Sequence, residues 1–359
     1  MKKKKVVVGM SGGVDSSVAA YLLQQQGYDV IGVTMEIWQQ EDSCLLETEG
    51  GCCGLSAVED ARRVASKLGI PYYVMNFRDI FRKQVIDDFI NEYMEGRTPN
   101  PCIVCNRKVK WEAMLKRCLD IGADYIATGH YSRIEKLENG RYAIKRSVTE
   151  KKDQTYALYS LTQEQLKHTV MPVGEYKKDE IRDMANKIGL NVASKPDSME
   201  ICFVPDKDYA GFIEKTIDKP VSEGDFVDMK GNVIGRHKGI IHYTIGQRKG
   251  LNLAMGYPVF VTAIEPDTNR VVIGTDRDVF TDRLTAGRLN HMSEASFCED
   301  KIYTGKIRYN HKGTKCKVRY IDDDTIECMF LEPVRAVTPG QSLVLYDGDY
   351  IAGGGVIFT

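Results

Sequence analysis

A loop near the N-terminus combines the residue types that bind nucleotide phosphates. Gly9–Ser17 has the sequence GMSGGVDSS and follows Val6–Val8, an apolar run that predicts a buried parallel strand. A helical pattern over 16–26 comes next. Glycines let backbone N–H groups approach a polyphosphate, and a helix N-terminus adds the positive end of its dipole. Because the loop lacks the lysine of a Walker A motif, it predicts a different kind of phosphate site, in which Asp15 could hold Mg²⁺.

The second set of side chains that could take part in a reaction consists of cysteines. Cys102 and Cys105 lie in the proline-containing segment RTPNPCIVCN (97–106), and cations follow at positions 107, 108 and 110. Cationic neighbours and the start of a predicted helix favour a reactive thiolate at Cys105. Cys202 lies much later, in SMEICF (198–203). From these residues alone, the C-x-x-C pair could be redox-active, metal-binding or inert, and Cys202 is expected to be a core thiol.

Composition narrows the class of protein. The 359 residues include 49 Lys+Arg and 50 Asp+Glu, a formal net charge of -1, so any nucleic-acid site must be a local basic patch. No run approaches the roughly 18 apolar residues of a membrane span, and Val6–Met10, after the Lys2–Lys5 run, is too short for the apolar region of a signal peptide. We therefore expect a cytoplasmic protein without membrane contact, whose 10 cysteines are mostly reduced.

The order of predicted elements divides the chain into three domains. Strand and helix patterns alternate over 1–205, with helices expected near 80–94 and 108–122, which predicts an α/β fold with a doubly wound parallel sheet. Gly and β-branched residues dominate the rest. They predict a small central β-rich connecting domain over 206–277 and a C-terminal β-barrel over 278–359.

One stretch of the expected barrel is strongly basic. Lys301–Tyr320 contains seven Lys and Arg residues and no acid, interleaved with Tyr303, Tyr309 and Tyr320. Phosphate contacts and aromatic stacking are what single-stranded RNA loops require. The stretch therefore predicts an RNA-binding surface, and the alternative is a solvated basic strand balanced by Asp322–Asp324.

Seven motifs spread over the chain share one family resemblance. They are SGGVDSS, GRTPNPCIVCN, ATGHY (127–131), KDQTY (152–156), SMEICF, GQRKGL (246–251) and VRAVTPGQ (334–341). In combination they resemble the bacterial tRNA-specific 2-thiouridylases, a family of PP-loop ATP pyrophosphatases, over essentially the whole length. The resemblance implies a PP-loop, adenine nucleotide alpha hydrolase-like first domain, a tRNA-binding barrel, and ATP-dependent 2-thiolation of the wobble uridine of tRNA.

The reaction implied by the resemblance has two steps. ATP with Mg²⁺ adenylates O2 of the uridine and releases pyrophosphate, and sulfur then attacks C2 and expels AMP. Cys202 would carry the sulfur as a persulfide received from a donor protein, and Cys105 would be the nucleophile that releases it by forming a disulfide with Cys202. The expected substrates are the lysine, glutamate and glutamine tRNAs, recognised through the anticodon arm.

The resemblance also implies binding residues. ATP contacts are expected from Gly9, Met10, Ser11, Gly12, Gly13, Val14, Asp15, Ser16, Met35 and Gly129. Contacts with the target base and the remaining tRNA are expected from Asn100, Pro101, Cys102, His130, Lys152, Asp153, Gln154, Arg308, Tyr309 and Gln341.

One position departs from the family pattern, because Cys102 stands where many members have Asp after Asn-Pro. The resulting set of Cys102, Cys105 and Cys202 could hold a [4Fe–4S] cluster with an open iron that binds sulfide. We favour the persulfide route, because Cys105 and Cys202 match it residue by residue. Two further hypotheses are a PP-loop amino-acid ligase and an ATP-sensing RNA-binding protein without catalysis.

The remaining cysteines are expected to be structural or stay unassigned. Cys118 lies on a predicted helix, and Cys298, Cys316 and Cys328 are expected in the barrel core. No role is assigned to Cys44, Cys52 and Cys53.

Overall fold

The computed structural model describes residues 3–37, 55–190, 192, 201–217 and 220–359. Cys44, Cys52 and Cys53 lie outside these residues. The chain divides into two compact units. The first consists of Met1–Ile86, Pro101–Lys207 and Asp349–Ile351, and the second of Asp87–Asn100, Asp208–Gly348 and Ala352–Thr359. The domain boundaries expected at 205/206 and 277/278 stay predictions.

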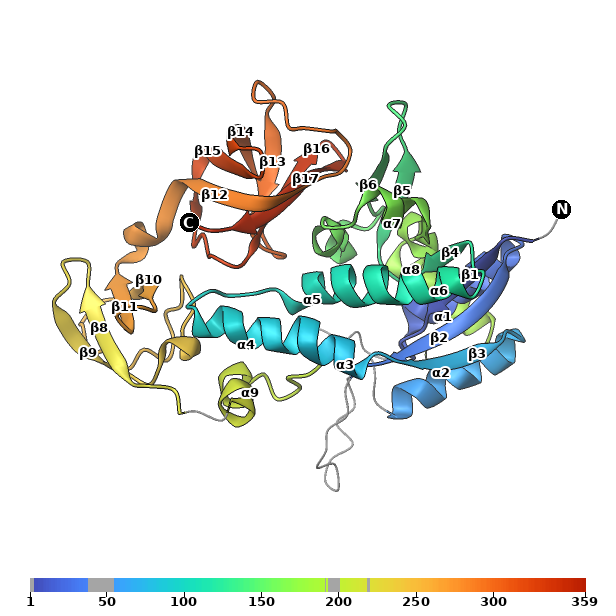
Figure 1. Cartoon of the computed structure of the whole chain (residues 1–359), viewed down its shortest axis with the longest axis horizontal. Coiled ribbons are helices and arrows are strands. Elements are labelled where there is room, and N and C mark those ends of the chain that lie inside the picture. Colours follow the sequence, from blue (N-terminus) through green and yellow to red (C-terminus); the bar gives the residue numbers. More distant parts are fainter. Residues whose placement is uncertain (1–2, 38–54, 191, 193–200, 218–219) are drawn as a thin grey trace. The chain divides into compact units, whose positions relative to one another are not determined.

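A parallel sheet forms the centre of the first unit (Figure 1). Val6, Val7 and Val8 of its middle strand are fully buried, which explains why an apolar run rather than an alternating pattern marks this strand. Neighbouring strands run parallel, so the predicted α/β fold is confirmed. In spatial order, the strands are β3 (Tyr72–Asn76), β2 (Asp29–Glu36), β1 (Lys5–Gly9), β4 (Tyr125–Ala127) and β7 (Thr169–Val170).

The strand order of this sheet reverses at β1. β2 pairs with one side of β1 and β4 pairs with the other. In such sheets, ligands bind outside the carboxyl ends of the strands at the point of reversal. Gly9–Ser17 follows β1 and Gly129 follows β4, so the fold places both at this edge.

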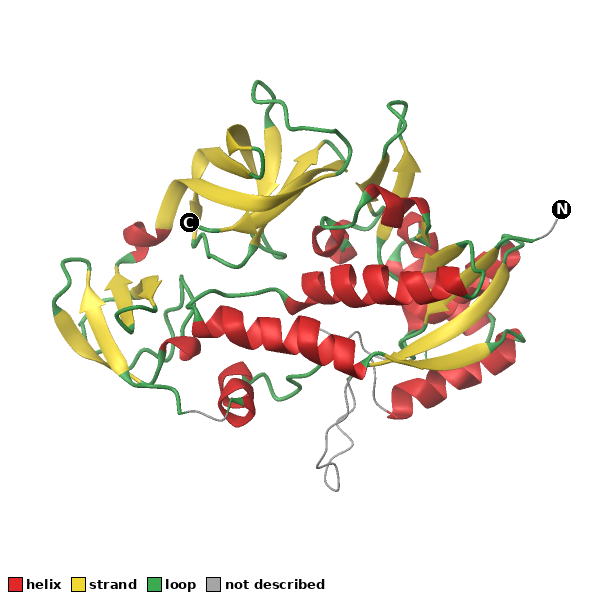
Figure 2. Ribbon diagram, in the orientation of Figure 1, coloured by secondary structure: helices red, strands yellow, loops and turns green. Residues whose placement is uncertain are grey.

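Helices and a hairpin connect these strands (Figure 2). The first helix, α1 (Val14–Gln25), packs Val14, Val18 and Leu22 into the core and is followed by Gly27 at φ 86°, the left-handed position expected there. The other α-helices are α2 (Leu55–Leu68), α3 (Arg78–Phe81), α5 (Pro101–Val104), α6 (Leu115–Asp120), α7 (Gln163–Lys167) and α8 (Lys178–Lys187). The remaining elements are the π-helical η1 (Arg82–Ile86) and η2 (Cys105–Met114), the 3-10 turns η3 (Glu150–Lys152), η4 (Thr155–Leu158) and η5 (Pro172–Glu175), and the hairpin strands β5 (Ser132–Lys136) and β6 (Tyr142–Arg146).

The helix that carries Cys105 begins earlier than expected. α5, η2 and α6 follow one another without a break from Pro101 to Asp120, whereas the sequence pattern predicted a start near residue 108. Proline suits the first helical position, because its fixed φ is helical and its missing N–H would have no partner there. Cys105 therefore lies one turn inside the helix, and the argument that a helix N-terminus activates this thiol is wrong.

The second unit contains a small sheet and a barrel. The sheet has the strand order β10-β11-β8-β9, with β8 (Gly224–Asp228), β9 (Val233–His237), β10 (Phe260–Glu265) and β11 (Arg270–Gly274). The unit also includes α4 (Asp87–Met94), α9 (Tyr209–Thr216), η6 (Ile240–His242) and η7 (Asp276–Val279). The predicted central β-rich module is thus present.

The predicted C-terminal barrel is confirmed. Its strands pair in the order β12-β15-β14-β13-β16-β17, and pairing of β12 with β17 closes the barrel. Cys316 and Cys328 are fully buried in its core, but Cys298 is exposed, so the expectation for Cys298 is wrong. The strands are β12 (Phe280–His291), β13 (Tyr303–Lys306), β14 (Thr314–Asp322), β15 (Thr325–Arg335), β16 (Ser342–Asp347) and β17 (Tyr350–Ile357).

Across the described part of the chain, helices that combine the length and apolar character needed to cross a membrane are absent.

Candidate active site

The Gly9–Ser17 loop is held in one conformation by its own serines. The Ser16 and Ser17 hydroxyls donate to the carbonyl oxygen of Gly13 at 3.2 Å and 2.8 Å. Gly12 has a φ of 69°, and a Cβ there would lie 2.4 Å from the carbonyl oxygen of Ala57. The loop therefore passes α2 so closely that only glycine fits at position 12.

Gly129 lies directly against this loop. A Cβ at Gly129 would lie 2.6 Å from the backbone nitrogen of Ser16 and 2.7 Å from the carbonyl carbon of Asp15. The structure therefore brings together the ATP residues expected in the loop and the one expected after β4. Met35, the other residue expected to contact ATP, is half-buried near the carboxyl end of β2.

Asp15 is the centre of a polar cluster that the sequence patterns did not reveal. The Lys178 ammonium donates to both carboxylate oxygens of Asp15 at 2.8 Å, and the Tyr131 hydroxyl donates to one of them at 2.7 Å. Lys178 is only 9% exposed. One local signal in the sequence points to Lys178. It is the first residue of α8, where a cation is unfavourable because of the helix dipole, so a lysine there indicates a stabilising partner elsewhere in the fold.

This cluster bears on the predicted role of Asp15 as a Mg²⁺ ligand. Mg²⁺ takes free oxygen ligands and usually binds through one or two carboxylates plus substrate phosphates. Both oxygens of Asp15 already accept hydrogen bonds from an ammonium group. The residues as arranged do not fit a Mg²⁺ ion held directly by Asp15.

His130 lies next to this cluster as a neutral hydrogen-bonding group. Its Nδ1 is 2.6 Å from the Thr128 hydroxyl, and its ring is 5.7 Å from that of Trp111. Burial and, to a smaller extent, the Lys110 ammonium hold the pKa of His130 well below its ordinary value of 6.5. The ring is therefore uncharged at neutral pH.

Protonation of His130 should destabilise the folded chain. Because the pKa of His130 is lower in the folded than in the unfolded state, its contribution to stability is fully present above about pH 6.5 and is lost as the pH falls toward the folded value. Between about pH 7 and pH 5, the free energy of unfolding in urea should fall more steeply for the unaltered chain than for His130→Gln, which cannot titrate. Parallel pH profiles for the two proteins would contradict this assignment.

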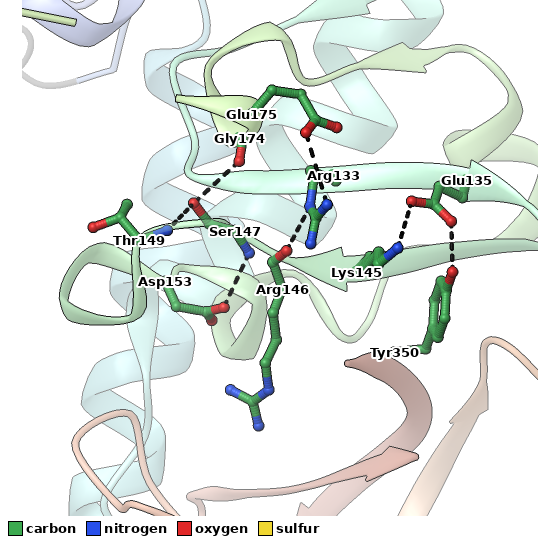
Figure 3. A network of polar contacts seen from close by, with 10 residues as sticks. All are labelled: Arg133, Glu135, Lys145, Arg146, Ser147, Thr149, Asp153, Gly174, Glu175 and Tyr350. Carbon is green, nitrogen blue, oxygen red and sulfur yellow. Dashed lines mark hydrogen bonds and ion pairs between the residues drawn. The ribbon is translucent and has the colours of Figure 1, made fainter. Parts of the chain in front are cut away.

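The segment Lys152–Gln154 is bound to Tyr131, the residue after His130. The Gln154 side-chain oxygen accepts a hydrogen bond from the Tyr131 backbone N–H at 2.9 Å, and the Gln154 N–H donates to the Tyr131 carbonyl at 3.1 Å. Asp153 has a structural role, since its carboxylate accepts from the backbone N–H of Ser147 at 3.3 Å (Figure 3). It also accepts from the backbone N–H of Thr155 at 3.1 Å. These bonds order the turn that presents Lys152.

The predicted cysteines differ in their exposure. Cys102 is exposed, whereas Cys105 and Cys202 are half-buried. The helix of Cys105 is tied to η4, because the Asn106 side chain donates to the Ala157 carbonyl at 2.8 Å. Next to Cys202, the Phe203 ring packs edge-on against Phe81 at 5.7 Å.

The same three thiols are the ligands that the [4Fe–4S] alternative requires. Within the described residues, no group of three or more His, Cys, Asp or Glu side chains is placed to hold a metal ion. The [4Fe–4S] alternative at Cys102, Cys105 and Cys202 stays a prediction.

In the second unit, Gln341 is bound to the segment that leads to Asn100. Its side-chain amide donates to the carbonyl oxygens of Thr98 and Pro99 at 2.8 Å and 3.3 Å, and the Thr98 N–H donates to the Pro339 carbonyl at 2.9 Å. Two predicted tRNA-contact motifs far apart in the sequence are therefore joined. Asn100 and Pro101 fall on either side of the division between the two units.

The basic segment of the barrel differs from its prediction in one respect. Tyr303 is fully buried in the barrel core, and the Tyr320 ring packs against that core and is stacked on Phe297 at 6.3 Å, so neither ring is a stacking platform. Period-2 alternation turns Tyr303 inward, because its strand has one buried face. Tyr309, outside the strands, is 40% exposed, and its contact with RNA stays a prediction.

Charge pairing also modifies the basic face. Arg319 pairs with Glu327 at 3.0 Å, and Lys301 pairs with Asp347 at 2.6 Å. The Arg308 guanidinium donates to the Arg335 carbonyl at 2.9 Å. The acids that pair with Arg319 and Lys301 are therefore Glu327 and Asp347, and not the Asp322–Asp324 of the alternative interpretation.

Comparison with known proteins places this arrangement in one family. Three family models match successive parts of the chain: a tRNA methyl transferase HUP domain over residues 4–206, a tRNA methyl transferase PRC-barrel domain over 210–275 and an aminomethyltransferase beta-barrel domain over 281–357. The tRNA-specific 2-thiouridylase MnmA of Lachnoclostridium phytofermentans is 64% identical over 99% of both chains. MnmA of Clostridioides difficile is 57% identical over 99% of this chain and 98% of that protein, and MnmA of Clostridium acetobutylicum is 57% identical over 99% of both.

These matches run from end to end and agree with the motifs in both units. They favour sulfur transfer over the amino-acid ligase and the non-catalytic RNA-binding protein. The chain belongs to the tRNA-specific 2-thiouridylase family.

Proposed function

We propose how the reaction of this family proceeds in this chain. The protein is an ATP-using tRNA sulfurtransferase that forms 2-thiouridine. In the first step, O2 of the wobble uridine attacks the α-phosphorus of ATP, pyrophosphate leaves, and AMP becomes attached through O2. In the second step, sulfur attacks C2, and AMP leaves with the former O2. The oxygen is thereby exchanged for sulfur.

The sulfur travels on Cys202 in this proposal. A persulfide donor protein transfers sulfane sulfur to the Cys202 thiol, and the terminal sulfur then forms a bond to C2. The Cys105 thiolate attacks Cys202 Sγ, which leaves the sulfur on C2 and joins the two cysteines in a disulfide. A thiol reductant restores both thiols. Half-burial of Cys105 and Cys202 supports this assignment, because it shields the persulfide while leaving the thiols reachable.

The observation that carries the ATP step is the contact between Gly129 and the start of α1 at the reversal point of the sheet. It supports a triphosphate bound along Gly9–Ser16, with backbone N–H groups as donors. Lys178, held beside this loop by Asp15, would supply the cation that a Walker A lysine supplies in other loops.

The substrate and its location follow from the same proposal. The lysine, glutamate and glutamine tRNAs would bind through His130 and Lys152 of the first unit and Arg308, Tyr309 and Gln341 of the second. The target base must leave its stack to meet the α-phosphate. Action on tRNA would place the protein in the cytoplasm.

The test is mass spectrometry of unmodified tRNA(Lys) after anaerobic incubation with the protein, ATP, Mg²⁺ and a persulfide donor, with iron removed throughout. We expect the wobble uridine to gain the mass of one sulfur in exchange for one oxygen. Omission of ATP should prevent the change. Thiolation that appears only after cluster reconstitution would overturn the persulfide route, and failure under both conditions would overturn the proposed reaction.

A further inference from the structure

The GQRKGL motif has no role in the reaction described above. It lies in the second unit between η6 and β10. The Gly246 N–H donates to the Val261 carbonyl at 2.8 Å, and the Val261 N–H donates to the Gln247 carbonyl at 3.0 Å. These two bonds attach the first half of the loop to β10.

The Gln247 side chain joins two parts of the loop by hydrogen bonds. Its oxygen accepts a hydrogen bond from the Thr244 N–H at 3.0 Å, and its nitrogen donates to the Lys249 carbonyl at 3.0 Å. Leu251, which ends the motif, is only 5% exposed. Gly246 and Gly250 have φ values of 86° and 78°, conformations that glycine adopts without strain. The loop is therefore fixed at both ends and bridged in the middle.

This ordered loop presents two adjacent cations to solvent. Arg248 and Lys249 are exposed, and among the described residues neither charged end takes part in an ion pair. Two other exposed arginines of the second unit are paired, Arg236 with Asp225 at 2.8 Å and Arg319 with Glu327 at 3.0 Å. A rigid backbone that carries unpaired cations loses little entropy when it meets an anion.

The loop also adjoins a residue expected to contact RNA. A Cβ at Gly246 would lie 2.6 Å from the Cβ of Ala336. The Arg308 guanidinium donates to the carbonyl oxygens of Arg335 and Ala336 at 2.9 Å and 3.5 Å. Gly246 and Arg308 thus contact the same short segment, and Arg248 follows two residues after Gly246 in the loop.

We propose that the 246–251 loop binds the sugar-phosphate backbone of the tRNA substrate through Arg248 and Lys249, and so extends the RNA surface of Arg308 and Tyr309 onto the central module. This inference rests on the proposed function, since it takes tRNA as the ligand. The loop presents no aromatic ring for base stacking, so its contribution is to affinity and not to base choice. Contact with phosphates releases counterions and makes affinity depend on salt.

The test measures the salt dependence of tRNA binding by the full chain. The affinity for unmodified tRNA(Lys) is determined between about 50 and 200 mM salt for the unaltered chain and for the double variant Arg248→Gln/Lys249→Gln. The logarithm of the association constant falls as the logarithm of the salt concentration rises. In the variant we expect this fall to be shallower, with a slope smaller in magnitude by about 2, or about 1 for each phosphate that the variant no longer neutralises. The charge-preserving double variant Arg248→Lys/Lys249→Arg should keep the original slope.

Two controls separate charge from loop order. Lys230→Gln removes an exposed lysine elsewhere in the same module and should leave the slope unchanged. Gln247→Ala removes the bridge across the loop but keeps both cations, so it should weaken binding severalfold with little change in slope.

An unchanged slope in the Arg248→Gln/Lys249→Gln variant would overturn the proposal. If that variant instead loses stimulation by the persulfide donor at an unchanged tRNA slope, the loop binds the donor protein and the proposal is also wrong. Thiolation by the unaltered chain is measured in parallel. If the unaltered chain thiolates tRNA but has the same salt slope as the variants, only the assignment of the loop fails. If the unaltered chain binds tRNA without thiolating it, the proposed reaction fails.

Discussion

Cys202→Ser should abolish thiolation of tRNA while leaving the first half of the reaction intact. Without the Cys202 thiol, no persulfide forms, and we expect the rate of 2-thiouridine formation to fall by about 10⁴-fold or more, as for other nucleophile replacements. O2 of the uridine can still attack ATP, so pyrophosphate release should continue as a burst limited to a single turnover. Thiolation is followed by mass spectrometry of the tRNA, and pyrophosphate by a coupled assay.

Cys105→Ser should differ from Cys202→Ser in one observable. Because Cys202 remains, the protein should still accept sulfur from the donor, and intact-protein mass spectrometry should detect the added sulfur in Cys105→Ser but not in Cys202→Ser. Cys298→Ser is the matched control, since Cys298 is an exposed barrel thiol outside the described site, and it should thiolate normally. Sulfur loading on the Cys202→Ser variant would contradict the assignment of Cys202 as the carrier.

Lys178→Met should lower the rate of pyrophosphate release by about 10²–10³-fold, the usual effect of removing one preorganised charge-stabilising donor. The same change leaves the Asp15 carboxylate, whose side chain is 27% exposed, without its cation. We therefore also expect a loss of stability of about 1–3 kcal/mol. Pyrophosphate release is measured at saturating ATP and tRNA, and stability by urea denaturation.

The double variant Asp15→Asn/Lys178→Met separates the two effects. It removes both charges, so stability should largely return, while pyrophosphate release should stay low because no cation faces the triphosphate. Lys178→Arg keeps a cation and should retain more activity than Lys178→Met. If the double variant regained full pyrophosphate release, Lys178 would serve only to neutralise Asp15, and its role toward ATP would be refuted.

Local sequence patterns predicted most of the fold and the location of the phosphate loop. The Val6–Val8 run, the glycines around Ser11 and the alternation of strands with helices depend on interactions between residues a few positions apart, and these patterns survive in the folded chain. The helix that carries Cys105 begins at Pro101 rather than near residue 108, because a proline that suits a loop also suits the first turn of a helix. Tyr303 and Tyr320 were misplaced for a similar reason, since a basic face alone does not tell which aromatic rings point inward.

By itself, the sequence determined the family, the α/β and barrel fold classes and the position of the phosphate loop. Each of these depends on motifs or periodicities of contiguous residues. Only the tertiary structure decided that Lys178 meets Asp15 across 163 positions, that Gly129 packs on the start of α1, and that Gln341 binds the segment before Asn100. Such contacts arise from the packing of whole elements. Their energies depend on burial and on exact donor positions, which neighbours in the sequence do not encode.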